Sequence, residues 1–180
     1  GHQGIVRMRG WNQEMTYAHV LSGPNGDAAS YLNSAHGGSG TCCAMPQGAG
    51  HKTIGRNEPI EVDYSVGING YLGDQSRTYV IGELPASLQR AHDCSRRIHD
   101  RFAETAGPGV PCRAVYEAAA AEADRAGLAP VFMGHGPDQV RFVGHGIGLE
   151  VDELPILAPR FDLPLEPGMV LALEPKFVLP

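Results

Sequence analysis

Hydrophobic and polar residues alternate most clearly in the segment 59–82. Ile60, Val62 and Tyr64 are separated by polar positions, and a second apolar run closes the segment. A two-residue period is typical of a β-strand with one buried face. The Asn-Gly pair at 69–70 favours a tight two-residue loop. The pattern therefore predicts an antiparallel hairpin centred on that pair.

A helical period follows the hairpin. Apolar side chains recur every three or four residues at 88–102 and again at 111–126. A Gly-Pro-Gly sequence at 107–109 ends the first segment, and Gly127 ends the second. We expect these two helices to cover a sheet.

The remaining strand-like segments are short. They are predicted at residues 5–8, 17–21, 147–151 and 169–178. Pro175 interrupts the last of them. The stretch 22–55 is rich in glycine and other breakers, and a compact domain seldom carries so long an irregular segment without a functional reason.

Composition and charge narrow the class of protein. A chain of 180 residues with 42% hydrophobic and 19% charged residues is neither disordered nor a membrane protein. A net charge of −6 argues against a nucleic-acid partner, which would need a basic face. The sequence contains no apolar run of membrane-spanning length and no secretory signal, so we expect a cytoplasmic protein without a membrane partner.

The four cysteines show no metal-binding or redox spacing. They are Cys42, Cys43, Cys94 and Cys112. We interpret them as reduced thiols that serve mostly as packing groups, although an oxidising compartment would allow them to pair.

The hairpin brings two aspartates together. With a two-residue loop, Ser65 lies opposite Asp74, so Asp63 and Asp74 are diagonal neighbours on one face, with Cα atoms about 7–8 Å apart. Two carboxylates so placed repel each other unless a shared proton, Arg77 or a metal ion lies between them. A pair of exposed hairpin aspartates is the alternative.

Two other residues extend this donor set. Glycines on both sides leave the His145 imidazole accessible. Glu174 ends an apolar run, where a buried carboxylate needs a partner or a cation. A structural histidine and a solvent-exposed acid are the alternatives. Two Asp, one His and one Glu together suit Mn, Co, Fe or Zn, whereas the motifs of serine hydrolases and phosphate-binding loops are absent.

These motifs resemble those of the M24 metallopeptidases, a family of Xaa-Pro aminopeptidases, prolidases and methionine aminopeptidases, with creatinase as a relative. Asp63 and Asp74 are similar to its first metal motif, residues 144–148 to its metal-histidine motif, and residues 167–175 to its first metal-glutamate motif. Gly-Tyr before Asp74 and Arg-Thr after it favour the Xaa-Pro members.

The resemblance implies an α+β pita-bread fold, a curved antiparallel sheet backed by helices, with a dinuclear metal site in its concave face. It implies that Asp63, a bridging Asp74, His145 and Glu174 hold two divalent ions (Mn, Co, Zn or Fe) in the intact parent. It further implies hydrolysis of short peptides through a metal-bridging hydroxide, with Glu174 as catalytic general base. Whether the protein forms a homodimer is left open.

Both ends of the chain indicate a piece of a longer protein. The sequence lacks an initiator Met and stops at Pro180 within an apolar run. The family also has a bridging Glu beyond the position of Glu174, which this chain does not reach. We therefore expect residues 1–180 to form a single catalytic domain, truncated at both ends.

Substrate recognition departs from the family pattern. Arg141 and Asp152 stand where the peptidases carry histidines. We assign both to substrate binding together with His36, for which His51 is the alternative. These changes leave two other functions open: a creatinase-like hydrolase that does not cleave peptides, and a degenerate module that only binds them.

Overall fold

The structure is a computed structural model that describes residues 18–30 and 34–180. Its strands are β1 (Ala18–Ser22), β2 (Pro59–Ile68), β3 (Tyr71–Val80), β4 (Gly144–Gly146), β5 (Glu153–Ile156) and β6 (Leu171–Leu173). Its helices are α1 (Ala86–Thr105) and α2 (Cys112–Arg125), with short 3-10 turns η1 (Gly23–Asp27), η2 (Ala129–Val131) and η3 (Gly136–Asp138). The predicted α+β class is confirmed.

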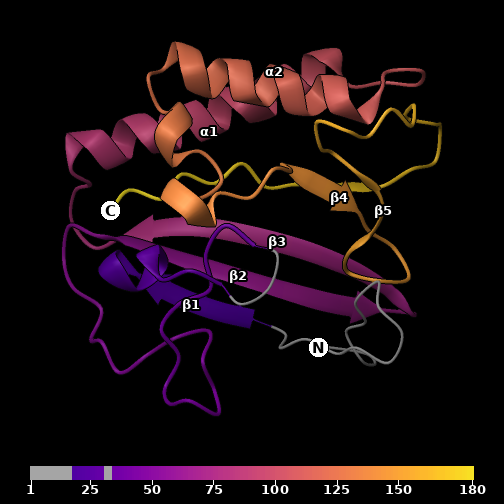
Figure 1. Ribbon diagram of the computed structural model, residues 1–180. Helices are drawn as coiled ribbons and strands as arrows, with labels where there is room; N and C mark the ends of the chain where they lie inside the picture. The colour runs from indigo at the N-terminus through magenta and orange to yellow at the C-terminus, as the bar shows by residue number, and fades with distance from the viewer. Residues whose placement is uncertain (1–17, 31–33) are drawn as a thin grey trace.

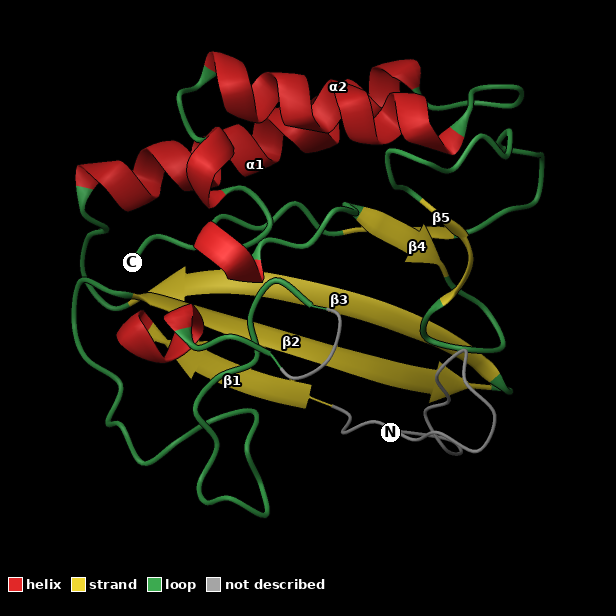
Figure 2. Cartoon of the chain, viewed as in Figure 1, coloured by secondary structure: helices red, strands yellow, loops and turns green. Residues whose placement is uncertain are grey.

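These elements form three levels. Helices α1 and α2 lie on one side, the sheet β1-β2-β3 lies on the other, and the small sheet β5-β4-β6 lies between them (Figures 1 and 2). Every strand pairing within the two sheets is antiparallel. The predicted strand at 17–21 corresponds to β1, except for its first residue, which lies outside the described residues together with the whole of the predicted strand at 5–8.

The hairpin forms in the predicted register. Ser65 lies opposite Asp74, and Asp63 lies opposite Ser76. Asn69 and Gly70 both have positive φ angles, 54° and 85°, as a type I′ turn requires. This turn matches the right-handed twist of the two strands, and it therefore fixes which residues share a face.

The main apolar core lies between the two helices and the small sheet. Its buried residues include Cys94 and Ile98 from α1, Ala119 from α2, and Val143 and Leu157 beside β4. The helices therefore cover a sheet, as predicted.

Two of the four cysteines belong to this core. Cys94 and Cys112 are fully buried, whereas Cys42 and Cys43 are exposed. All four are free thiols. The interpretation as packing groups therefore holds for the first pair and is wrong for the second.

The strand predicted at 147–151 is wrong: β4 ends at Gly146 and the chain then bends. The apolar side chains of Ile147 and Val151 are buried against Leu72 of β3, so the apolar pattern reflects this contact and not a strand. The bend is held by hydrogen bonds from the Leu72 N–H to the Gly148 carbonyl (2.7 Å) and from the Ile147 N–H to the Val170 carbonyl (3.1 Å).

The predicted strand at 169–178 is only partly formed. It is reduced to β6, and Glu174 follows directly after it. Pro175 has no N–H to extend the ladder.

The glycines around His145 have a packing role. A Cβ on Gly144 would lie 2.3 Å from the Ala172 carbonyl oxygen, and one on Gly146 would lie 2.4 Å from the Leu154 carbonyl oxygen. Only glycine allows the neighbouring strands to approach β4 so closely. The expectation that these glycines expose the imidazole is wrong, because His145 is 7% exposed.

The stretch 22–55 is irregular wherever the structure describes it, apart from Ser22 at the end of β1, the turn η1 and an isolated bridge between Cys42 and Met45. In the part of the chain that is described, no helix has the length and apolarity needed to cross a membrane.

Candidate metal centre

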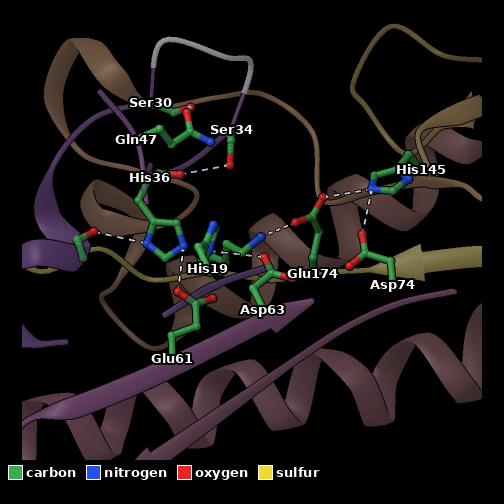
Figure 3. A network of polar contacts seen from close by, with 12 residues as sticks. His19, Ser30, Ser34, His36, Gln47, Glu61, Asp63, Asp74, His145 and Glu174 are labelled. Carbon is green, nitrogen blue, oxygen red and sulfur yellow. Dashed lines mark hydrogen bonds and ion pairs between the residues drawn. The ribbon is translucent and has the colours of Figure 1, made fainter. Parts of the chain in front are cut away.

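The four predicted ligands come from four separate segments. Asp63 lies on β2, Asp74 on β3, His145 on β4, and Glu174 directly after β6. The His145 Nε2 lies 3.3 Å from Glu174 Oε1 and 3.8 Å from Asp74 Oδ2 (Figure 3). The pairing of β4 with β6 and the β2–β3 hairpin bring these side chains to one place.

The His145 ring is held in one orientation. Its Nδ1 lies 3.0 Å from the Gly146 carbonyl oxygen, which can only accept a hydrogen bond, so Nδ1 carries a proton. Nε2 is left facing the two carboxylates. Burial by itself would lower the pKa of His145, but the ion pair with Glu174 outweighs it and raises the pKa to about 9.

Negative charge is concentrated around Asp74. Burial, followed by the charges of Asp63 and Glu174, raises the pKa of Asp74 to about 6. The neighbouring acids disfavour the ionised form of Asp74, and a cation placed among them would stabilise that form.

A lysine also reaches this group of acids. The Nζ of Lys176 forms an ion pair with Glu174 Oε2, whereas His145 pairs with the other carboxylate oxygen, Oε1. Burial alone would raise the pKa of Glu174, but the charges of Lys176 and His145 lower it to about 2. Burial disfavours the Lys176 ammonium, yet Glu174, Glu61 and Asp63 outweigh it and raise the lysine pKa.

The four residues are suited to divalent ions in their chemistry. Ions bound about 2.0–2.2 Å from their oxygen and nitrogen ligands place neighbouring ligand atoms roughly 3 Å apart, close to the His145–Glu174 separation. The two positive side chains that pair with Glu174 and the raised pKa of Asp74 indicate that positive charge stabilises this group of acids. Lys176 holds one carboxylate oxygen that an ion would use.

The residues assigned to substrate binding differ in how deeply they are buried. His36 is buried, and its Nε2 lies 2.8 Å from Oε2 of Glu61. Glu61 lies two positions before Asp63 on β2. Asp152 is half-buried, and its charge helps to raise the pKa of His145. Arg141 and His51 are exposed.

Three residues of this region were missed by the sequence reasoning: His19, Glu61 and Lys176. A signal for one of them existed, because Glu61 lies two residues before Asp63 on β2, whereas Lys176 follows Pro175 beyond the end of β6. Residues two apart on a strand share a face. His19 becomes a neighbour only through the register of β1 with β2, in which it is paired with Asp63.

The comparisons with known proteins agree with the motifs. The chain belongs to metallopeptidase family M24, which matches residues 2–180. It is 31% identical over 137 residues to an Xaa-Pro dipeptidase of Lactobacillus delbrueckii subsp. lactis, an alignment that covers 74% of this chain and 34% of that protein. It is 34% identical over 119 residues to a methionine aminopeptidase of Chlamydia pneumoniae, covering 64% of this chain and 38% of that protein.

Solved structures show the same fold. The dipeptidase PepE from Mycobacterium ulcerans matches with a TM-score of 0.75 and 27% identity, over 93% of this chain and 39% of that one. An X-Pro aminopeptidase from Thermotoga maritima matches with a TM-score of 0.71 and 26% identity, over 90% of this chain and 40% of that one. The chain therefore has the pita-bread fold of this family. It spans between a third and two fifths of the length of these relatives.

Proposed function

We propose that this chain is part of a metal-dependent peptidase of the Xaa-Pro dipeptidase or aminopeptidase type. The observation that carries the proposal is the convergence of Asp74, His145 and Glu174, with Asp63 beside them, in a chain of the M24 family. Its relatives include proteins named Xaa-Pro dipeptidase. The assignment of the site residues, the substrate and the ions belongs to this proposal.

In the proposed mechanism, Asp63, Asp74, His145 and Glu174 hold two divalent ions, of Mn, Co, Zn or Fe. Such ions, when bound, polarise a carbonyl and lower the pKa of water. His145 must lose the Nε2 proton that its ion pair with Glu174 favours, and Asp74 must be ionised.

Glu174 is the proposed general base. Its pKa of about 2 reflects ion pairs with Lys176 and His145. To accept a proton from the attacking water, Glu174 must give up at least one of these partners, because both stabilise its ionised form. The flexible Lys176 side chain is the partner that can withdraw.

The proposed substrate is a short peptide. Asp152, near His145, offers a negative charge to the amino terminus of a peptide, and His36 offers an imidazole from the other side of the centre. Arg141 is proposed to bind substrate from the surface. We further propose a cytoplasmic location, which the four free thiols support.

One observation favours a second function. Glu61 and Lys176 add a half-buried carboxylate and a half-buried ammonium beside the predicted ligands. Such charges suit a small substrate that carries charges of its own, and therefore a non-peptidase hydrolase on the same fold. Turnover of small charged amides without cleavage of dipeptides would favour this alternative.

The test uses the full-length protein. After treatment with EDTA it should not cleave Xaa-Pro dipeptides, and Mn²⁺ or Co²⁺ should restore cleavage. Asp74→Asn should abolish the restored activity, whereas Asp100→Asn, an exposed aspartate on α1, should leave it unchanged. Equal activity of the chelated and metal-loaded protein, or of the Asp74→Asn variant and the wild type, would refute the proposal.

A further inference from the structure

A second group of metal-ligating side chains lies beside the four predicted ligands and shares none of them. His19 comes from β1, His36 from the loop after η1, and Glu61 from β2 (Figure 3). One donor atom of each lies within 4.8 Å of the donor atoms of the other two. We call these three residues the His-Glu cluster. It is more compact than the four-residue centre, in which His145 connects Asp74 and Glu174.

The orientation of His36 is that of a metal ligand. Its Nδ1 lies 3.1 Å from the carbonyl oxygen of Gly26, which can only accept a hydrogen bond. Nδ1 therefore carries the proton, and Nε2 faces Glu61. Metal-bound histidines usually donate their other ring N–H to a carbonyl or carboxylate in this manner, which fixes the ring and the tautomer.

Two nitrogen atoms in the cluster lack a hydrogen-bond partner. The Nε2 atoms of His19 and His36 are both buried and neither makes a hydrogen bond. The His36 Nε2 is 2.8 Å from Glu61 Oε2, and the His19 Nε2 is 3.5 Å from Asp63 Oδ2, but neither contact has hydrogen-bond geometry. Because buried polar atoms are nearly always satisfied, these two nitrogens point to a missing ligand.

The burial and arrangement of the rings fit the same conclusion. His36 is 8% exposed as a residue, and the side chains of His19 and Glu61 are 17% and 16% exposed. The two imidazole rings are nearly perpendicular, at 84°, with centroids 6.2 Å apart. They therefore do not stack.

We propose that His19, His36 and Glu61 form a further metal site, which takes Zn²⁺ or its close substitute Co²⁺. Two imidazoles and one carboxylate are a common ligand set for zinc with one open position. Tetrahedral ligands about 2.0–2.1 Å from zinc are roughly 3.3 Å apart, so the His36–Glu61 pair would open by only about half an ångström. The open position is left for water or for a polar group of the substrate.

Lys176 limits the affinity of this site. Its charge acts on both Glu61 and His19, so an ion in the cluster is repelled by the ammonium. Replacing the ammonium with an apolar group of similar length should therefore tighten zinc binding at the cluster. A simple ion pair between His36 and Glu61 would show no such coupling to zinc.

The test separates this site from the four-residue centre. In full-length protein carrying Asp74→Asn and His145→Ala, we expect elemental analysis to find one Zn²⁺ per chain, and Co²⁺ to give a visible absorption band from nitrogen and oxygen ligands. Adding Glu61→Gln should weaken Zn²⁺ binding by more than about 100-fold, since loss of a direct ligand exceeds the cost of losing an outer partner. Glu166→Gln, at an exposed acid, is the matched control and should change nothing.

Two results would overturn the proposal: a folded background variant that binds no Zn²⁺, or a Glu61→Gln protein that binds it as tightly as its parent. If the background variant does not fold, the wild type replaces it as the reference. Glu61→Gln and His36→Gln should then each lower the Zn²⁺ content by one ion per chain, and an unchanged content would overturn the site. Failure of the peptidase proposal leaves these readouts unaffected, because none of them measures hydrolysis.

Discussion

Glu174 binds His145 through one carboxylate oxygen and Lys176 through the other. Both partners are largely buried, with side chains 9% and 11% exposed. One carboxylate therefore pairs with two positive side chains, and any ion that binds Glu174 must share it with them.

Removing the charge of Glu174 should destabilise the metal-free protein. Glu174→Gln removes the carboxylate that pairs with both Lys176 and His145. Breaking a buried pair costs about 3 kcal/mol or more, and the remaining acids Glu61, Asp63 and Asp74 offset part of that loss. Urea denaturation in the presence of chelator measures the loss. Glu166→Gln, at an exposed acid, should leave the free energy of unfolding unchanged. Equal stability of the Glu174 variant and the wild type would contradict the role given to this ion pair.

Removing the Lys176 ammonium should tighten the binding of a divalent ion. Lys176→Met frees Glu174 Oε2 and removes a positive charge from the centre. Repulsion between like charges a few ångströms apart at a partly buried site exceeds ~1.4 kcal/mol, so the Kd for Mn²⁺ should fall by about tenfold or more. Calorimetric titration measures this change. Lys52→Met, which breaks the ion pair with Glu58 in a distant loop, is the control. An unchanged or weaker affinity in the Lys176 variant would show that the ammonium does not compete with the ion.

Binding of a divalent ion should release protons. In the metal-free protein the pKa of His145 is about 9, so its ring is protonated at pH 7.5 and must become neutral to bind an ion. We expect about one proton to be released per chain at pH 7.5, and the apparent affinity to rise about tenfold per pH unit up to about pH 9. Below pH 6 the dependence should steepen, because Asp74, with a pKa of about 6, is also protonated. Calorimetry in two buffers of different ionisation enthalpy counts the protons, and a release of none would contradict the ion pair.

The same pKa of His145 affects stability. Because it is raised from 6.5 to about 9 on folding, the ion pair contributes stability that is fully present below pH 6.5 and is lost as the pH rises through 9. Asp74 affects stability over a different pH range. Its pKa is raised to about 6 on folding, so its ionisation lowers the free energy of unfolding as the pH rises from about 4 to 6. Comparison of the wild type with His145→Gln between pH 6.5 and 9.5 isolates the first effect: the free energy of unfolding should fall with pH in the wild type and stay flatter in the variant.

The packing of β4 gives a prediction that is independent of metal. A Cβ at Gly144 would lie 2.3 Å from the Ala172 carbonyl oxygen, which belongs to the paired strand. Gly144→Ala should therefore lower the free energy of unfolding by about 2 kcal/mol or more, as overpacking does. Gly73→Ala on β3 is the matched control, since nothing lies within 4 Å of its added Cβ. Equal effects of the two substitutions in urea denaturation would contradict the close approach.

The sequence predicts the hairpin well because local chemistry determines it. The Asn-Gly pair at 69–70 requires the turn that forms, and the turn sets the register that puts Asp63 and Asp74 on one face. The two helices are equally local, with a clear period and glycines after them. These parts need no knowledge of distant contacts.

The rest depends on contacts between distant segments. The apolar run at 147–151 looks like a strand, yet it is apolar because a bend packs beneath Leu72 of β3. His19 and His36 meet Glu61 only through the pairing of β1 with β2 and the path of an irregular loop. Lys176 supplies a counter-charge to an acid, and a search for metal ligands gives no reason to include a lysine.

We propose that Asp63, Asp74, His145 and Glu174 together hold the divalent ions of an M24 peptidase. The most direct test is a Mn²⁺ titration of the full-length protein in which electron paramagnetic resonance measures the free ion. We expect the wild type and Asp100→Asn to bind two Mn²⁺ per chain tightly, and Asp74→Asn and His145→Gln each to bind fewer. Identical binding curves for the wild type and Asp74→Asn would contradict it.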